Sequence, residues 1–167
     1  GPYRRPGLLE ASLASTHLTG EVIADGKHLP ATLLNVAYNA LGPQRLCAVS
    51  DATSGAGLEE GATFTMGGMT YIVEDGVGMM LDRSSFAGST TLLGDMIAIL
   101  VRSGIPLVDA VRMASDTPAS VLGLERTMGR IQPGLQADFA ILASDLKPIQ
   151  TIKRGTTIWN VAEGAPA

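Results

Sequence analysis

The sequence predicts an α/β fold, and three stretches support that class. Leu46–Val49 is a short apolar run with the length and composition of a buried strand. Glu21–Ala24 is predicted to be another short strand, and Ala31–Leu41, between the two, carries apolar residues at helical spacing. Because a helical crossover joins neighbouring parallel strands, we expect these two strands to lie side by side and parallel.

Composition restricts the class of protein. The 167 residues are 46% hydrophobic, which is enough for one ordinary domain with a core. The net charge of −4 comes without a basic run, so nothing points to nucleic acid or an anionic membrane as a partner. The apolar stretch Met96–Val101 is too short to cross a bilayer, and no signal-peptide pattern opens the chain. We therefore expect a soluble, cytoplasmic protein, in which the single cysteine, Cys47, is a buried apolar residue.

The N-terminal part contains two predicted helices. The first is a short helix over Leu8–Leu18. Asp25-Gly26 forms a turn after the first strand, and this turn leads to His28. The second helix begins after Pro30, which suits a first helical turn, and Gly42-Pro43 ends it.

The centre of the chain predicts a β excursion over about residues 61–82. Ala62–Met66 and Met69–Val73 flank Gly67-Gly68, which is a signal for a hairpin. Val77–Leu81 follows as a third short strand.

The rest of the chain is predicted to form three helices followed by three strands. Apolar periodicity, with proline near helix starts and glycine near helix ends, marks the helices as Leu92–Val101, 106–114 and 118–123. Short apolar or β-branched runs mark the strands as Phe139–Leu142, Ile149–Lys153 and Thr157–Trp159.

Asp51 lies at the carboxyl end of the strand Leu46–Val49. In barrels and open sheets of parallel strands this end holds catalytic side chains, so Asp51 is a candidate general base. The alternative is that Asp51 caps the turn that follows, which is the commoner role of aspartate at such a junction. If the two strands are parallel, His28 and Asp51 leave corresponding ends of neighbouring strands.

Four motifs resemble the amidohydrolase superfamily. The segment GRIQPGLQADFAIL, residues 129–142, is similar to the closing signature of that superfamily, where the chain leaves a barrel for a small β sandwich. Within the superfamily, VIADGKH at 22–28, VSDAT at 49–53 and FAGST at 86–90 resemble the N-acetylglucosamine-6-phosphate deacetylase family. Several motifs in the right order are more specific than any one of them, and they favour the catalytic interpretation of Asp51.

The resemblance implies the C-terminal portion of a TIM-barrel amidohydrolase. Residues 1–137 would supply the last two barrel strands with their helices and the β-hairpin insertion, and residues 138–167 would supply strands of the small β sandwich and a loose tail. Two strands cannot close an eight-stranded barrel, and open strand edges favour association. We therefore expect a homodimer or another form of self-association.

The implied reaction is hydrolysis of the N-acetyl group of N-acetylglucosamine 6-phosphate to glucosamine 6-phosphate and acetate. The complete enzyme is implied to use a divalent metal, zinc or iron, held by a glutamate and two histidines on earlier barrel strands. We expect those ligands to lie outside this sequence, with Asp51 as the one potential metal ligand here, so that this chain alone lacks the metal and is inactive. The alternatives are another C–N hydrolase of the superfamily and a non-catalytic remnant that binds a sugar phosphate or oligomerises.

The resemblance also implies roles for individual residues. Asp51 matches the aspartate that takes a proton from a metal-bound water and passes it to the departing amine. His28 matches a histidine that contacts the sugar. Arg4 matches an arginine that binds the substrate phosphate, often from a neighbouring subunit, and Arg5 is the alternative. The loop that lines the N-acetyl pocket, largely through main-chain atoms, matches Phe86, Ala87 and Gly88.

Overall fold

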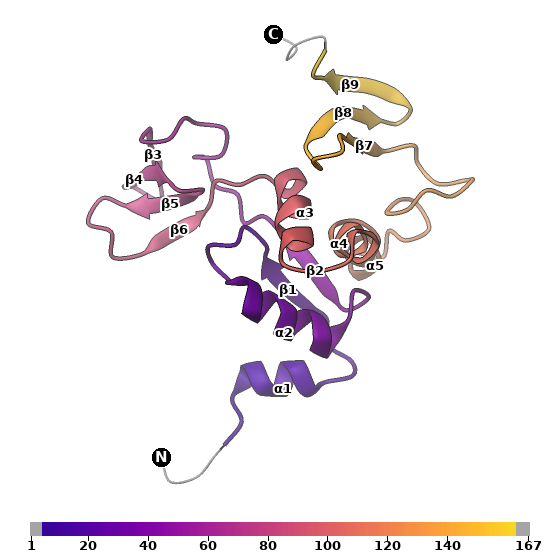
Figure 1. Cartoon of the computed structure of the whole chain (residues 1–167), viewed down its shortest axis with the longest axis horizontal. Coiled ribbons are helices and arrows are strands. Elements are labelled where there is room, and N and C mark those ends of the chain that lie inside the picture. Colours follow the sequence, from indigo (N-terminus) through magenta and orange to yellow (C-terminus); the bar gives the residue numbers. More distant parts are fainter. Residues whose placement is uncertain (1–4, 163–167) are drawn as a thin grey trace.

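The computed structural model describes residues 5–162 and confirms the α/β class. Three sheets are present in this range: a parallel pair, a four-stranded antiparallel sheet and a three-stranded antiparallel sheet. Figure 1 shows the parallel pair beside the helices, with the other two sheets at separate places on the molecule. The strands are β1 (Gly20–Ile23), β2 (Leu46–Val49), β3 (Thr63–Met66), β4 (Met69–Glu74), β5 (Val77–Met80), β6 (Phe86–Ser89), β7 (Phe139–Leu142), β8 (Pro148–Lys153) and β9 (Thr156–Asn160).

Strands β1 and β2 form the parallel pair that the sequence predicts. Their register runs from Gly20 opposite Leu46 to Ile23 opposite Val49. Helix α2 (Ala31–Leu41) connects them and ends at Gly42, whose φ of 70° lies in the left-handed region that favours glycine. Both strands therefore end at the same edge of the pair.

The main core lies between this parallel pair and the helices. Helices α2, α3 (Leu93–Arg102) and α4 (Leu107–Ala114) all pack on β2. Burial of each large apolar side chain stabilises the fold by about 1.5–3 kcal/mol. Cys47 is buried, as predicted. The core residues are Val22, Ala24, Leu34, Leu41, Leu46, Ala48, Met96, Ile97, Leu100, Ile105, Ala110 and Met113.

The central β excursion contains one strand more than predicted. The hairpin β3–β4 and the strand β5 are confirmed, but the segment predicted to be a loop at Phe86–Ser89 is strand β6, which pairs with β5. The sheet therefore continues to Ser89, past the predicted end of the insertion near residue 82. A four-residue segment that contains a glycine has no strand pattern of its own, and pairing with β5 determines its conformation.

The helix boundaries differ most from prediction in α1 and α5. Helix α1 (Leu8–Ala14) ends four residues before the predicted end at Leu18, because Ser15 is extended and its hydroxyl accepts hydrogen bonds from the backbone N–H groups of His17 and Leu18. Helix α5 (Asp116–Val121) begins two residues before Pro118. Proline is compatible with this position because the first-turn N–H groups have no partner within a helix.

The three predicted C-terminal strands are confirmed and form an antiparallel sheet. Strands β7, β8 and β9 pair in chain order, and β8 and β9 are joined by a tight turn at Arg154-Gly155. Figure 1 shows this sheet on the other side of the helices from β3–β6.

None of the helices within residues 5–162 has the length and hydrophobicity that a membrane-spanning helix needs.

Candidate functional site

The candidate site lies where β1 and β2 end. Asp25 and His28 follow β1, and Asp51 follows β2. The parallel register confirms the prediction that His28 and Asp51 leave corresponding strand ends. One rigid edge therefore supports both residues.

Asp25 is a buried carboxylate with every oxygen occupied. Its side chain is fully inaccessible to solvent. Oδ1 accepts the backbone N–H groups of Lys27 at 2.9 Å and His28 at 3.0 Å, and Oδ2 lies 2.8 Å from Nδ1 of the His28 ring. Burial opposes ionisation, but these bonds outweigh it and hold the pKa of Asp25 below its usual value.

The imidazole of His28 is held on two sides. Asp25 binds its Nδ1, and the ring of Phe86 meets it edge to face with centroids 5.3 Å apart and planes at 70°. An ion pair between Lys27 and Asp75 also ties this loop to the turn between β4 and β5. The side chain of His28 keeps 19% of its surface exposed, so a ligand can reach it.

Asp51 is exposed, and β6 holds its backbone in place. Its φ of 49° lies in the left-handed region, which is unfavourable for a residue other than glycine. The Asp51 carbonyl accepts the N–H of Ser89 at 3.0 Å, and the Ser89 carbonyl accepts the N–H of Thr53 at 2.9 Å. These bonds form a short parallel bridge between Ala52 and Ser89, which fixes the segment after β2 against β6.

Gly88 allows this close approach. Its φ is 74°, and a Cβ atom at this position would lie 2.7 Å from the Asp51 carbonyl oxygen and 3.0 Å from Asp51 Oδ2. Any other residue would therefore displace the segment that carries Asp51. The resemblance implies that Gly88 lets a ligand approach the main chain, whereas the neighbour that the structure shows at Gly88 is the Asp51 segment.

Ser89 joins three parts of the site. It is fully buried, its hydroxyl donates to the Gly76 carbonyl at 3.3 Å, and the same oxygen accepts the N–H of Thr91 at 3.0 Å. Its backbone binds the segment that carries Asp51 and Thr53. Sequence reasoning missed both Ser89 and the role of Asp25, which it treated only as part of a turn.

The predicted site residues form two contact pairs. His28 meets Phe86, and Asp51 meets Gly88. The Ala87 side chain packs instead on the small core of the β3–β6 sheet. Arg4 lies outside the described residues, and Arg5 is exposed before helix α1.

The site does not form a metal centre by itself. Within residues 5–162, no three histidine, cysteine, aspartate or glutamate side chains are grouped so as to hold a metal ion. Stable zinc sites use three or four protein ligands, so the metal implied by the resemblance does not fit this part of the chain alone.

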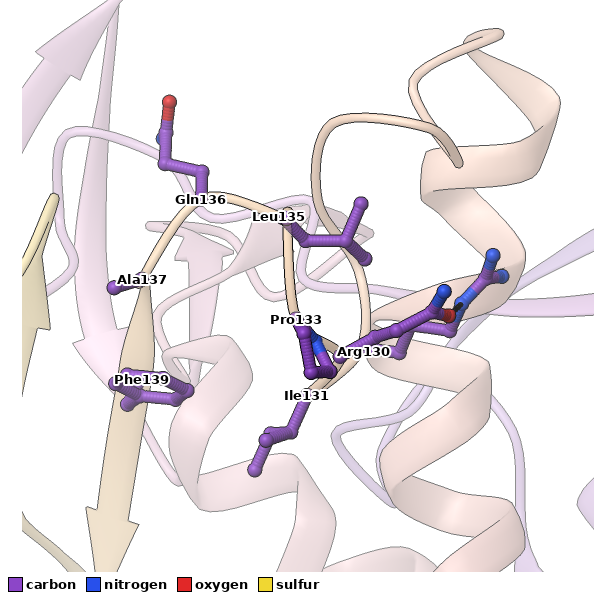
Figure 2. Close-up of a pocket in the computed structure, with 9 residues that line it drawn as sticks. Arg130, Ile131, Pro133, Leu135, Gln136, Ala137 and Phe139 are labelled. Atoms are coloured by element: carbon purple, nitrogen blue, oxygen red, sulfur yellow. Dashed lines mark hydrogen bonds between the residues drawn. The ribbon is translucent and has the colours of Figure 1, made fainter.

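A hollow of about 330 Å³ lies away from these residues, between α5 and β7. Figure 2 shows it along the loop that carries Pro133 and Leu135, with Phe139 at one end and Arg130 at the other. Arg130 forms an ion pair with Asp116 of α5 at 3.2 Å. The hollow includes none of the predicted site residues.

Comparisons with known proteins find one family over most of the chain. The model of the amidohydrolase family matches residues 7–158. The N-acetylglucosamine-6-phosphate deacetylase of Vibrio furnissii is 32% identical over 161 residues, which are 96% of this chain and 40% of that protein. The N-acetylgalactosamine-6-phosphate deacetylase of Escherichia coli O157:H7 is 29% identical over 145 residues, which are 86% of this chain and 38% of that protein.

Solved structures of similar proteins superpose closely. The N-acetylglucosamine-6-phosphate deacetylase of Thermotoga maritima has a TM-score of 0.83 at 30% identity, covering 92% of this chain and 42% of that one. A mutant of the Mycobacterium smegmatis N-acetyl-D-glucosamine-6-phosphate deacetylase, solved in complex with N-acetyl-D-glucosamine-6-phosphate, has a TM-score of 0.84 at 28% identity, covering 93% of this chain and 41% of that one. The chain thus spans about two-fifths of the length of these relatives.

Proposed function

The chain belongs to the amidohydrolase family, and from that premise we propose that it supplies the proton-transfer and sugar-binding part of a deacetylase of N-acetylglucosamine 6-phosphate. The products would be glucosamine 6-phosphate and acetate. The observation that carries the proposal is the parallel β1–β2 pair, which supports Asp51 and the Asp25–His28 pair at one edge. The names of the relatives support the substrate class.

Asp51 is proposed as the group that moves the proton. Its carboxylate would accept a proton from the attacking water as the water oxygen bonds to the amide carbon. It would then give the proton to the nitrogen as the C–N bond breaks, so that the amine leaves neutral. Exposure of Asp51 next to a fixed backbone supports this role, because a base must reach the substrate from a defined position.

Other residues are proposed to bind the substrate. His28 would contact a sugar hydroxyl, and the loop of Phe86, Ala87 and Gly88 would line the acetyl pocket through main-chain atoms. The contact of Phe86 with His28 and of Gly88 with Asp51 supports one shared site. Arg4 would bind the phosphate, with Arg5 as the alternative, because a guanidinium fork matches phosphate oxygens.

The proposed architecture is the C-terminal part of a TIM barrel over residues 1–137 and strands of a β sandwich over 138–167. The helix-linked parallel pair supports the first part, and the β7–β9 sheet supports the second. Amidohydrolases are generally metal-dependent, and we propose zinc or iron for the complete enzyme. Its ligands would be groups other than those of residues 5–162, apart from a contact with Asp51.

The test uses a chimaera that joins the remaining part of the Thermotoga maritima deacetylase to this chain. Asp51→Asn keeps the shape of the side chain and removes its basicity, so kcat for acetate release should fall about 10²–10⁴-fold. Asp145→Asn is the matched control, because Asp145 is exposed in the turn between β7 and β8. Normal turnover by Asp51→Asn would make Asp51 a cap and not a base.

A non-catalytic module that binds a sugar phosphate is the second candidate. The absence of a metal-binding group within residues 5–162 favours it. The same chimaera separates the two candidates, because a module would bind N-acetylglucosamine 6-phosphate without releasing acetate. Comparing this substrate with N-acetylgalactosamine 6-phosphate would identify the preferred epimer.

A further inference from the structure

We infer that Asp25 is a positioning residue that fixes His28 in the tautomer with its proton on Nδ1, so that Nε2 presents a lone pair to the substrate. The inference rests on the proposed function only in assigning His28 to the sugar. It adds a chemical requirement to that assignment, because a nitrogen lone pair accepts a hydrogen bond and cannot donate one.

The carboxylate of Asp25 dictates the position of the proton. An ionised carboxylate can only accept hydrogen bonds, and the low pKa of Asp25 keeps it ionised at neutral pH. The 2.8 Å contact between Oδ2 and Nδ1 therefore requires a proton on Nδ1. In a neutral imidazole the other nitrogen then has no proton.

The ring has little freedom to avoid this arrangement. The backbone N–H of His28 is itself bound to Oδ1 of Asp25, so main chain and ring are held by one carboxylate. Phe86 packs edge to face against the ring. Among the described residues, the hydrogen bonds of His28 use its backbone N–H and Nδ1, which leaves Nε2 for a ligand.

Nε2 is thereby specified as an acceptor. A sugar hydroxyl can donate to it, whereas a carbonyl or phosphate oxygen cannot. Asp25 would thus make His28 select for a hydroxyl group, although Asp25 is buried and touches no substrate.

Asp25→Asn should reverse the tautomer while keeping the shape of the site. The single amide oxygen of asparagine would be needed by the two backbone N–H groups that now bind Oδ1. The amide NH₂ would then face Nδ1 and donate to it, which moves the ring proton to Nε2.

The experiment is a long-range ¹H–¹⁵N NMR spectrum of the chain labelled with ¹⁵N-histidine, recorded at about pH 8.5, above the range in which histidine usually titrates. The chain has two histidines, and His17→Gln assigns their signals. We expect His28 to show a protonated Nδ1 and an unprotonated Nε2, and Asp25→Asn to exchange the two. Phe86→Leu is the matched control, which removes the aromatic contact and should leave the tautomer unchanged.

A wild-type His28 with the proton on Nε2, or with the same tautomer mixture as exposed His17, would overturn the inference. The wild-type spectrum decides this even if Asp25→Asn does not fold. A folded Asp25→Asn chain with an unchanged tautomer would also overturn it. The Nδ1–H tautomer in a chain whose chimaera binds no amino-sugar phosphate would uphold the role of Asp25 and refute the proposed function.

Discussion

Replacing Gly88 with alanine should displace Asp51 and destabilise the protein. An alanine at a φ of 74° costs about 1–2 kcal/mol relative to glycine. The new Cβ would also lie 2.7 Å from the Asp51 carbonyl oxygen and 2.8 Å from Thr53 Cγ2. Overpacking of this kind typically adds about 1–3 kcal/mol. The expected loss in the free energy of unfolding is therefore about 2–5 kcal/mol, measured by urea denaturation.

The matched control is Gly68→Ala, in the turn between β3 and β4. Gly68 has a φ of 80°, but a Cβ there would meet nothing within 4 Å. This variant should lose only the conformational part, about 1–2 kcal/mol. The excess loss in Gly88→Ala, about 1–3 kcal/mol, then measures the contact with the Asp51 segment. Equal losses in the two variants would refute the claim that the Asp51 segment packs too closely on Gly88 to admit a side chain.

Two further predictions concern charge. Asp25→Asn should lower stability at pH 7, but the difference from wild type should shrink as the pH falls below about 4. Although burial opposes ionisation, the hydrogen bonds keep the pKa of Asp25 in the folded protein below its value in the unfolded chain. The Asp25 carboxylate therefore stabilises the fold above the unfolded pKa, and this stabilisation is lost as the pH falls below the folded pKa. If urea denaturation gives the same difference in stability between wild type and Asp25→Asn at pH 7 and at pH 3, this reasoning is contradicted. In the chimaera, Arg4→Ala, or Arg5→Ala if Arg5 is the phosphate ligand, should weaken binding of N-acetylglucosamine 6-phosphate by about 2–5 kcal/mol in calorimetry and leave N-acetylglucosamine unaffected. Equal losses on both ligands would indicate a folding defect.

Local signals in the sequence are sufficient to predict the β1–α2–β2 unit that supports the site. Helix α2 was predicted with its observed ends because Pro30 and Gly42 mark its boundaries. The strand β2 was equally clear, since its apolar run is short and bounded by polar residues. The parallel pairing of β1 and β2 then followed from the geometry of the crossover, and with it the common edge for His28 and Asp51.

Long-range contacts explain what sequence reasoning missed. Strand β6 exists because β5 offers it a partner, and no local pattern marks it. Asp25-Gly26 is a common turn sequence, so the sequence predicts a turn there. It does not predict the bond between the Asp25 side chain and the His28 ring. A carboxylate three residues before a histidine, directly after a strand, is the signal that could have revealed the pair. Gly88 and Asp51 are distant in the sequence but close in the fold. Sequence patterns point to Gly88 as a site residue, but they do not show that Asp51 lies beside it.

The order of strands in the β3–β6 sheet has a consequence for folding kinetics. Each strand pairs with its neighbour in the chain, so the sheet closes only short loops and should form early. The bridge between Ala52 and Ser89 spans that whole sheet and needs both of its ends in place. In pulsed hydrogen exchange during refolding, amides of β4 and β5 should therefore be protected before the amide of Thr53, which binds the Ser89 carbonyl. The loop that carries Asp51 would reach its native position only after a sheet that follows it in the sequence has folded.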